Sequence, residues 1–329
     1  MTRCVKALAA AVCAILSMAL ADSARASERW DMPMAYAATN YHSENGRLFA
    51  EAVTSATGGE LEIVTHPGGS LFKGGEIFRA VRTGQVPIGE RLMSALANED
   101  PLFEIDALPF LATSFDEAWK LYQASRPAIE KALEERGLML LYAVPWPPQG
   151  LYSKNPVNQA SDLNGSRFRA YNAATSRLAE LVGAIPTKIE TAELSQAFAT
   201  GVAESMITSG ATGYDRKIWE YVQYWYDVQA WLPKNMVIVN LDAWNSLDAR
   251  TQGIVIGAAS MAEAAGWSKA RELSAWYAEQ LAANGMTVEG PSEQLAQDFR
   301  GIGETMTNDW LDRVGDLGSS LVETFRGMM

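Results

Sequence analysis

Residues 162–172 read Asp-Leu-Asn-Gly-Ser-Arg-Phe-Arg-Ala-Tyr-Asn, and this stretch organises our interpretation of the chain. Its Asn-Gly pair is typical of a turn, after which polar and apolar side chains alternate as they do in a strand. Asn172 suits the N-cap of a helix that we predict over residues 173–182. The alternation places Arg169 and Tyr171 on one face of a strand that leads into a helix start.

Arg169 is the candidate anion-binding residue of this stretch. A guanidinium group at a strand end offers a planar, permanently charged fork to a carboxylate, and backbone N–H groups of the helix start lie close by. From these residues alone an alternative stays open, in which Arg169 is a surface charge or pairs with a structural acid.

Four motifs, in order along the chain, resemble those of the substrate-binding proteins of tripartite ATP-independent periplasmic (TRAP) transporters, the DctP-like solute receptors. The pattern Asp-Leu-x-Gly-x-x-x-Arg ends at Arg169 and resembles the signature of that family. The other three are Asp-Ala-Leu-Pro-Phe-Leu at 106–111, Gly-Ala-Ile-Pro-Thr at 183–187, and Glu-x-x-x-Ala-Phe-x-x-Gly-x-x-Glu at 193–204. The resemblance covers nearly the whole chain and implies a two-lobed α/β periplasmic binding protein fold.

The pattern of the first hundred residues agrees with an α/β fold. Strands are predicted over 30–35, 61–66 and 86–89, and helices over 44–57 and 75–83. This order indicates parallel strands with right-handed crossovers, in which ligands bind beyond the carboxyl ends of the strands.

Each lobe is expected to be a mostly parallel sheet flanked by helices. The expected division of the chain is a signal peptide over 1–26, a first lobe from 27–149 plus 235–275, and a second lobe from 150–234 plus 276–329. A helical pattern over 248–284 is long enough to lie along both lobes.

Two further features concern the path between the lobes. Residues 145–150, Pro-Trp-Pro-Pro-Gln-Gly, are stiffened by three prolines and form the expected first crossing. Before them, a capping box at Ser114 predicts a helix that ends at Ser125, and Pro127 predicts the start of another.

The first 26 residues have the features of a cleavable secretory signal peptide. Arg3 and Lys6 precede an apolar run over 7–20 that is too short to span a bilayer, and Ala-Arg-Ala at 24–26 is a typical cleavage motif. We therefore expect a periplasmic protein.

Charge and cysteine content restrict the partners. Both cysteines, Cys4 and Cys13, lie in the predicted signal peptide, so the mature protein is expected to have no disulfide. The net charge is −12, and the signal peptide holds three of 27 basic and one of 39 acidic residues, which leaves a net charge of −14. This balance argues against nucleic acid and anionic lipid as partners.

Motifs typical of enzymes are missing. The chain has two histidines, His42 and His66, and no Cys-x-x-Cys, His-x-x-x-His or Gly-x-Ser-x-Gly pattern. We therefore expect no catalytic residue, no metal and no cofactor. A secreted hydrolase or isomerase on a similar fold stays open as an alternative.

The expected ligand-binding residues lie at strand ends, loops and crossings. Aromatic rings at such places can wall a small-molecule pocket, and Glu90 directly follows a predicted strand. The full expected set is Arg169, Trp146, Tyr152, Tyr171, Asn172, Glu90, Thr208, Tyr214 and Tyr36. The aromatic residues over 219–231 are expected to pack in the core, and Glu90 has a surface position as its alternative.

The resemblance implies a monomeric receptor that closes on a small organic acid, with Arg169 clamping the carboxylate. It also implies delivery to an ion-gradient-driven permease with small and large membrane subunits. A second arginine of the family corresponds to Tyr152 here, so no second fixed positive charge is expected, and a small aromatic or monocarboxylic acid is favoured over a dicarboxylate. A small amine or zwitterion facing Glu90, and a role in sensing rather than transport, remain alternatives.

Overall fold

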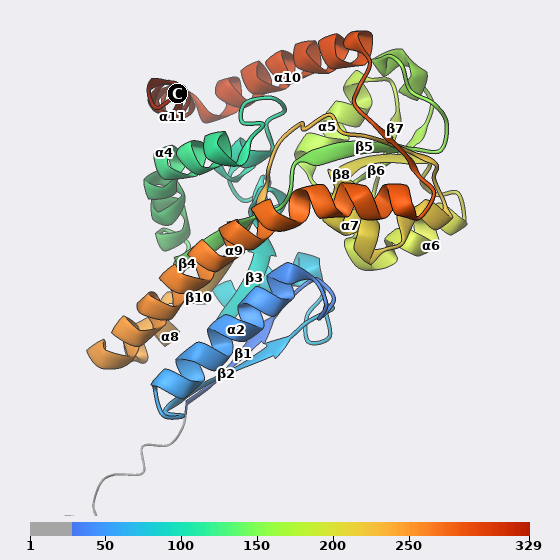
Figure 1. Ribbon diagram of the computed structural model, residues 1–329. Helices are drawn as coiled ribbons and strands as arrows, with labels where there is room; N and C mark the ends of the chain where they lie inside the picture. Colours follow the sequence, from blue (N-terminus) through green and yellow to red (C-terminus); the bar gives the residue numbers. More distant parts are fainter. Residues whose placement is uncertain (1–27) are drawn as a thin grey trace, which may run out of the picture.

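The computed structural model describes residues 28–329, so the predicted signal peptide over 1–26 lies outside the described residues. Two groups of strands and helices lie side by side, and one long helix runs along both (Figure 1). Within the described residues, no helix combines the length and the apolar composition needed to cross a membrane.

The strands of the described chain form three sheets. Their bounds are β1 (Glu28–Pro33), β2 (Leu61–His66), β3 (Ile88–Leu92), β4 (Leu138–Pro145), β5 (Gln149–Ser153), β6 (Arg167–Ala170), β7 (Ile185–Lys188), β8 (Ser205–Ser209), β9 (Tyr224–Tyr226), β10 (Lys234–Asn240) and β11 (Thr287–Glu289). The pair β1-β2 lies beside the sheet β3-β10-β4 in the first lobe. The second lobe has the strand order β11-β9-β5-β8-β6-β7.

Every antiparallel pairing in these sheets involves β5 or β10. β10 pairs with β3 and β4, and β5 pairs with β8 and β9, whereas the pairs β1-β2, β6-β7, β6-β8 and β9-β11 are parallel. β5 follows the first crossing between the lobes, and β10 follows the second. The remaining pairing is the parallel arrangement that the sequence pattern predicts.

The helices flank these sheets. Their bounds are α2 (Tyr41–Ala56), α3 (Ile77–Arg82), α4 (Phe115–Glu134), α5 (Ala173–Leu181), α6 (Leu194–Ala199), α7 (Gly210–Asp215), α8 (Leu241–Ser246), α9 (Ala249–Ala283), α10 (Glu293–Val314) and α11 (Asp316–Gly327). The predicted β-α-β-α-β start is present as β1, α2, β2, α3 and β3, but β3 begins at Ile88 and extends to Leu92.

The prediction of a helix end before Pro127 is wrong, because α4 continues through this proline. Proline removes one backbone donor and crowds the preceding turn. The apolar side chains of Leu121, Tyr122, Ile129 and Leu133 are buried on both sides of it. Packing of these side chains on the core therefore holds the helix together across the proline.

Helix α9 is 35 residues long and confirms the helix predicted over 248–284. It packs against α2 and β4 in the first lobe and against α7 and β11 in the second. Gly266 allows the close approach to β4, because a Cβ atom at this position would collide with the side chain of Val144.

The C-terminal helices connect the lobes a second time. α10 packs against α5, and α11 packs against α4, next to which it lies in Figure 1. Leu321, Val322 and Phe325 of α11 are buried in the core of the first lobe. We therefore propose that 316–327 belongs to the first lobe, and not to the second as the division at 276–329 has it.

Candidate functional site

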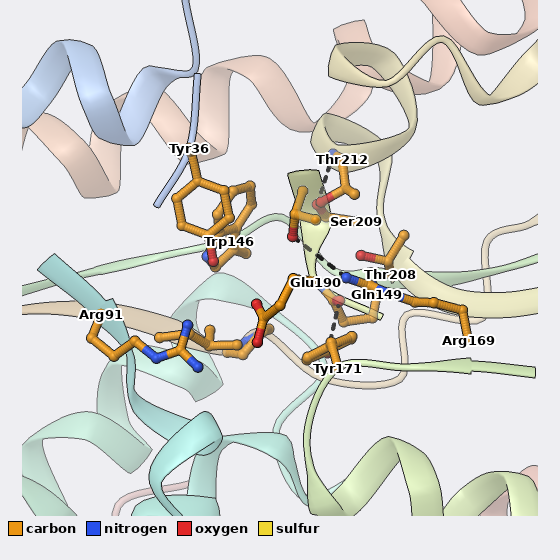
Figure 2. A pocket seen from close by; sticks show the side chains of 13 residues that line it. Tyr36, Arg91, Trp146, Gln149, Arg169, Tyr171, Glu190, Thr208, Ser209 and Thr212 are labelled. Carbon is orange, nitrogen blue, oxygen red and sulfur yellow. Dashed lines mark hydrogen bonds between the residues drawn. The ribbon is translucent and has the colours of Figure 1, made fainter. Parts of the chain in front are cut away.

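A pocket lies between the two lobes, at the strand ends where the fold predicts it (Figure 2). Its empty volume is about 410 Å³ with open solvent at the mouth included, so an occupant is limited to a small molecule. The lining residues are Tyr36, Arg91, Leu92, Trp146, Gln149, Arg169, Tyr171, Glu190, Thr191, Thr208, Ser209, Thr212 and Pro233.

Arg169, at the end of β6, is held by the second lobe. Its side chain is only 2% exposed. Nε donates to the carbonyl of Ile189 at 3.0 Å, Nη2 donates to Thr191 Oγ1 at 3.4 Å, and the guanidinium carbon lies 4.9 Å from the centre of the Tyr171 ring. These contacts fix the guanidinium while part of it still faces the pocket.

The Arg169 guanidinium remains charged at neutral pH. Burial lowers its pKa to about 10, and the nearby Tyr171 and Glu190 act in the opposite direction. Burial also raises the pKa of Tyr36 and of Tyr171, so both phenols are neutral hydrogen-bonding groups.

Arg91 brings a second positive charge to the pocket, from β3 of the first lobe. The residue is 6% exposed, and within the described part of the chain its guanidinium makes no hydrogen bond and no ion pair. The expectation that a second fixed positive charge is missing is therefore wrong. The charge comes from the opposite lobe and not from the position of Tyr152.

Glu190 is an acidic residue among the lining residues. Figure 2 shows its carboxylate between Arg91 on one side and Arg169 on the other. Both groups come close to Gly74: a Cβ atom added to this glycine would lie 3.1 Å from Arg91 Nη1 and 3.4 Å from Glu190 Oε2. Arg91 and Glu190 nevertheless form no ion pair with each other. The pocket thus carries two positive charges and one negative charge, with space between them.

The first lobe contributes an aromatic wall. The rings of Tyr36 and Trp146 meet edge to face, with 4.7 Å between their centres. Behind them, Trp146 Nε1 donates to Asn235 Oδ1 at 2.9 Å, and Asn235 Nδ2 donates to Glu90 Oε1 at 3.0 Å. His42 Nδ1 lies 3.5 Å from the same carboxylate oxygen.

The second lobe contributes a hydrogen-bonding wall. The Tyr171 hydroxyl donates to Gln149 Oε1 at 3.1 Å and accepts from Trp231 Nε1 at 3.2 Å. Ser209 caps α7 by accepting from the backbone N–H of Thr212. Because these polar groups are hydrogen-bonded to each other, the wall is ordered without a ligand.

The structure brings five of the nine predicted site residues to the pocket: Arg169, Trp146, Tyr171, Thr208 and Tyr36. The other four do not line it. Glu90 is buried behind the aromatic wall, where it accepts from Asn235. Tyr214 packs against Trp276, with 4.8 Å between the ring centres.

Tyr152 and Asn172 have structural contacts. Tyr152 is fully buried and its hydroxyl donates to the carbonyl of Ser209 at 3.1 Å. Asn172 caps α5 through Oδ1, and its Nδ2 donates to Ser94 Oγ of the first lobe at 2.9 Å. This last bond joins the two lobes beside the pocket.

Sequence reasoning missed Arg91, Glu190 and Gln149. Arg91 follows Glu90 directly, and the strand sequence Ile-Gly-Glu-Arg-Leu has no alternation of polar and apolar side chains that would show which of the two faces the pocket. Glu190 follows β7, a strand that we interpreted only as part of a proline turn. Among the described residues, no group of three side chains is placed to hold a metal ion.

Comparisons with known proteins agree with this geometry. Residues 34–312 match the family model for bacterial extracellular solute-binding proteins, family 7 (DctP). A TRAP solute-binding protein from a marine metagenome (unidentified microbe), specific for pyroglutamate, is 51% identical, with 92% of this chain and 99% of that chain covered and a TM-score of 0.91. DctP6 of Bordetella pertussis, an extracytoplasmic solute receptor that binds pyroglutamic acid, is 46% identical, with 91% and 99% covered and a TM-score of 0.90.

A curated relative is more distant. The ectoine/5-hydroxyectoine-binding periplasmic protein UehA of Ruegeria pomeroyi is 22% identical over 244 residues, which are 73% of this chain and 71% of that protein.

The family consists of binding proteins rather than enzymes, which confirms the expected absence of catalysis, and the two-lobed fold is confirmed as well. The chain therefore belongs to the family 7 bacterial extracellular solute-binding proteins, the extracytoplasmic solute receptors of TRAP transporters.

Proposed function

We propose that this receptor binds pyroglutamate or a closely similar small cyclic monocarboxylic acid. The observation that carries the proposal is the pair of buried arginines, Arg169 and Arg91, which approach the same pocket from different lobes. The similar receptors that bind pyroglutamate are 46–51% identical to this chain, and their full-length agreement supports the same ligand class.

The charges of the pocket favour a monoanion. Two guanidinium groups and the Glu190 carboxylate give a net charge of +1, which one ligand carboxylate would neutralise. A dicarboxylate would place its second negative charge in the same small pocket as Glu190, at a cost in free energy. The amine alternative loses support, because Glu90 is not a lining residue.

Ligand capture would proceed by closure of the lobes. Since the lining residues come from both lobes, a ligand bound between them stabilises the closed state over the open one. We propose that the signal peptide over 1–26 directs export to the periplasm, and that the closed monomer delivers its ligand to a TRAP permease with small and large membrane subunits.

Calorimetry on the protein exported and purified from the periplasm tests the ligand class. The ligands to compare are pyroglutamate, glutamate as a zwitterion, glutarate as a dicarboxylate, and a small amine. We expect pyroglutamate to bind with a Kd of about 1 µM or tighter and the others at least about 100-fold more weakly. Tighter binding of glutarate or of the amine would overturn the proposal.

A further inference from the structure

We propose that Glu190 is a specificity-determining residue, which accepts a hydrogen bond from an N–H group of the bound acid. This inference rests on the proposed function, because it concerns the same pocket. It names a chemical feature of the ligand, a ring N–H, which the two arginines cannot recognise since they only donate hydrogen bonds.

Both neighbours of Glu190 in the sequence are hydrogen-bonded to Arg169, the residue proposed to bind the ligand carboxylate. Glu190 directly follows Ile189, whose backbone carbonyl accepts from Arg169 Nε at 3.0 Å. Thr191, the next residue, accepts from Arg169 Nη2 at 3.4 Å. The segment 189–191 therefore wraps around the guanidinium, and the position of Glu190 relative to Arg169 is fixed.

The Glu190 carboxylate has acceptor capacity that the described chain does not use. No hydrogen bond and no ion pair joins it to any other described residue, although Arg91 lies on the opposite side of the same cavity. A carboxylate that lines a pocket with free lone pairs needs donors, and a bound ligand can supply one. Figure 2 shows Glu190 between the two arginines, with its carboxylate turned toward the Arg91 side of the pocket.

Glu190 also stands at the boundary between the pocket and a second, outer cavity. Four residues line both cavities: Tyr36, Arg91, Glu190 and Thr191. The other residues that line the outer cavity include Gly68, Gly69, Lys73 and Glu193.

The chemistry of the carboxylate selects between two acids of the same shape. Pyroglutamate has a lactam N–H, which donates to an acidic oxygen. Its lactone analogue has a ring oxygen in the same place, whose lone pairs would face the carboxylate and repel it. Glu190 is half-buried, so a ligand that supplies an N–H group is favoured over an analogue whose ring oxygen faces the carboxylate with lone pairs.

The test measures the affinity of pyroglutamate and of the lactone analogue for three forms of the protein. These are the wild type, Glu190→Gln and Glu193→Gln. Glu193 is a matched control, because it lies on the outer cavity but does not line the pocket. Thermal melting of each form without ligand shows that the variants are folded.

We expect the wild type and Glu193→Gln to prefer the lactam by roughly 100-fold or more. Glu190→Gln should reduce the preference to less than roughly 10-fold, because the glutamine amide can donate to the ring oxygen as well as accept from the N–H. If Glu190→Gln keeps the wild-type preference, for example because both acids gain or lose affinity by the same factor, the inference is overturned.

Two other outcomes separate this inference from the proposed function. If the wild type binds both acids equally well, the ligand class stands and the role of Glu190 is wrong. If the wild type binds neither acid, the proposed function itself fails.

Discussion

The two walls of the pocket are built differently. In the second lobe, Arg169 and Tyr171 are held by hydrogen bonds to their own lobe, and the wall is polar. In the first lobe, Arg91 has no partner among the described residues, and the wall is largely aromatic. The polar wall is therefore organised before the ligand arrives, whereas the wall with Arg91 depends on the ligand to compensate its charge.

The difference suggests an order of events. We propose that a ligand carboxylate first meets the fixed Arg169, and that closure then brings Arg91, Tyr36 and Trp146 onto the exposed side of the ligand. Each step is therefore sensitive to a different substitution.

Replacing the fixed arginine should weaken binding most. Arg169→Ala removes a buried charge-assisted contact, and we expect a loss of binding free energy of about 2–5 kcal/mol in calorimetry with pyroglutamate. Arg167→Ala is the matched control, since Arg167 lies on the same strand but is exposed and pairs with Glu204. Equal effects of both variants would contradict the assigned difference between the two arginines.

Replacing the unpartnered arginine should have a smaller effect. For Arg91→Ala we expect a loss of about 1.5–3 kcal/mol in binding free energy, because Arg91 must give up water when the lobes close. The half-buried Arg82, which lies outside the pocket and pairs with Glu99, provides the control variant Arg82→Ala. If Arg91→Ala lost more binding free energy than Arg169→Ala, the proposed order, in which Arg169 meets the ligand before Arg91, would be wrong.

The support of the aromatic wall can be weakened while an aromatic ring is kept at position 146. Trp146→Phe deletes the donor to Asn235 Oδ1, and we expect the free energy of unfolding to fall by about 1–2 kcal/mol in denaturant titrations. The partly exposed Trp119, whose indole N–H has no hydrogen bond within the described residues, gives the control Trp119→Phe. No difference between the two variants would show that the bond behind the wall contributes little.

The buried histidine behind the same wall predicts a pH dependence. Burial lowers the pKa of His42 below its ordinary value of 6.5, while Glu90 acts in the opposite direction. The unfolded chain therefore takes up a proton near this value and the folded chain only at lower pH, so stability falls as the pH falls below about 6.5. His42→Gln should make the free energy of unfolding less steep between about pH 7 and about pH 5.5. An unchanged slope would exclude His42 as its source.

The sequence was sufficient for the strand that carries Arg169 and insufficient for the strand that carries Arg91. Around Arg169, the turn, the strand and the Asn172 cap are local features, and each is present in the structure. In β3, by contrast, all five residues are buried, so no contrast between polar and apolar positions reveals which side chain faces the pocket. Because the strand begins at Ile88 and pairs with β10, Arg91 faces the pocket and Glu90 does not.

Two other differences have the same origin. The side chains of Tyr152 and Gln149 point to opposite faces of β5. The tyrosine is therefore buried in the core, and the glutamine lines the pocket. Glu190 is brought to the pocket by the turn that follows β7, which pairs in parallel with β6. Both depend on strand pairing between distant segments, which a local pattern does not contain.

The continuous helix α9 sets a limit on how far the molecule can open. At about 1.5 Å per residue it is roughly 50 Å long, and its regular backbone hydrogen bonds resist a sharp bend. The lobes can therefore swing only through the range that gentle curvature of this rod allows. On this scaffold we therefore expect a change of ligand to require different pocket side chains and not a wider opening between the lobes.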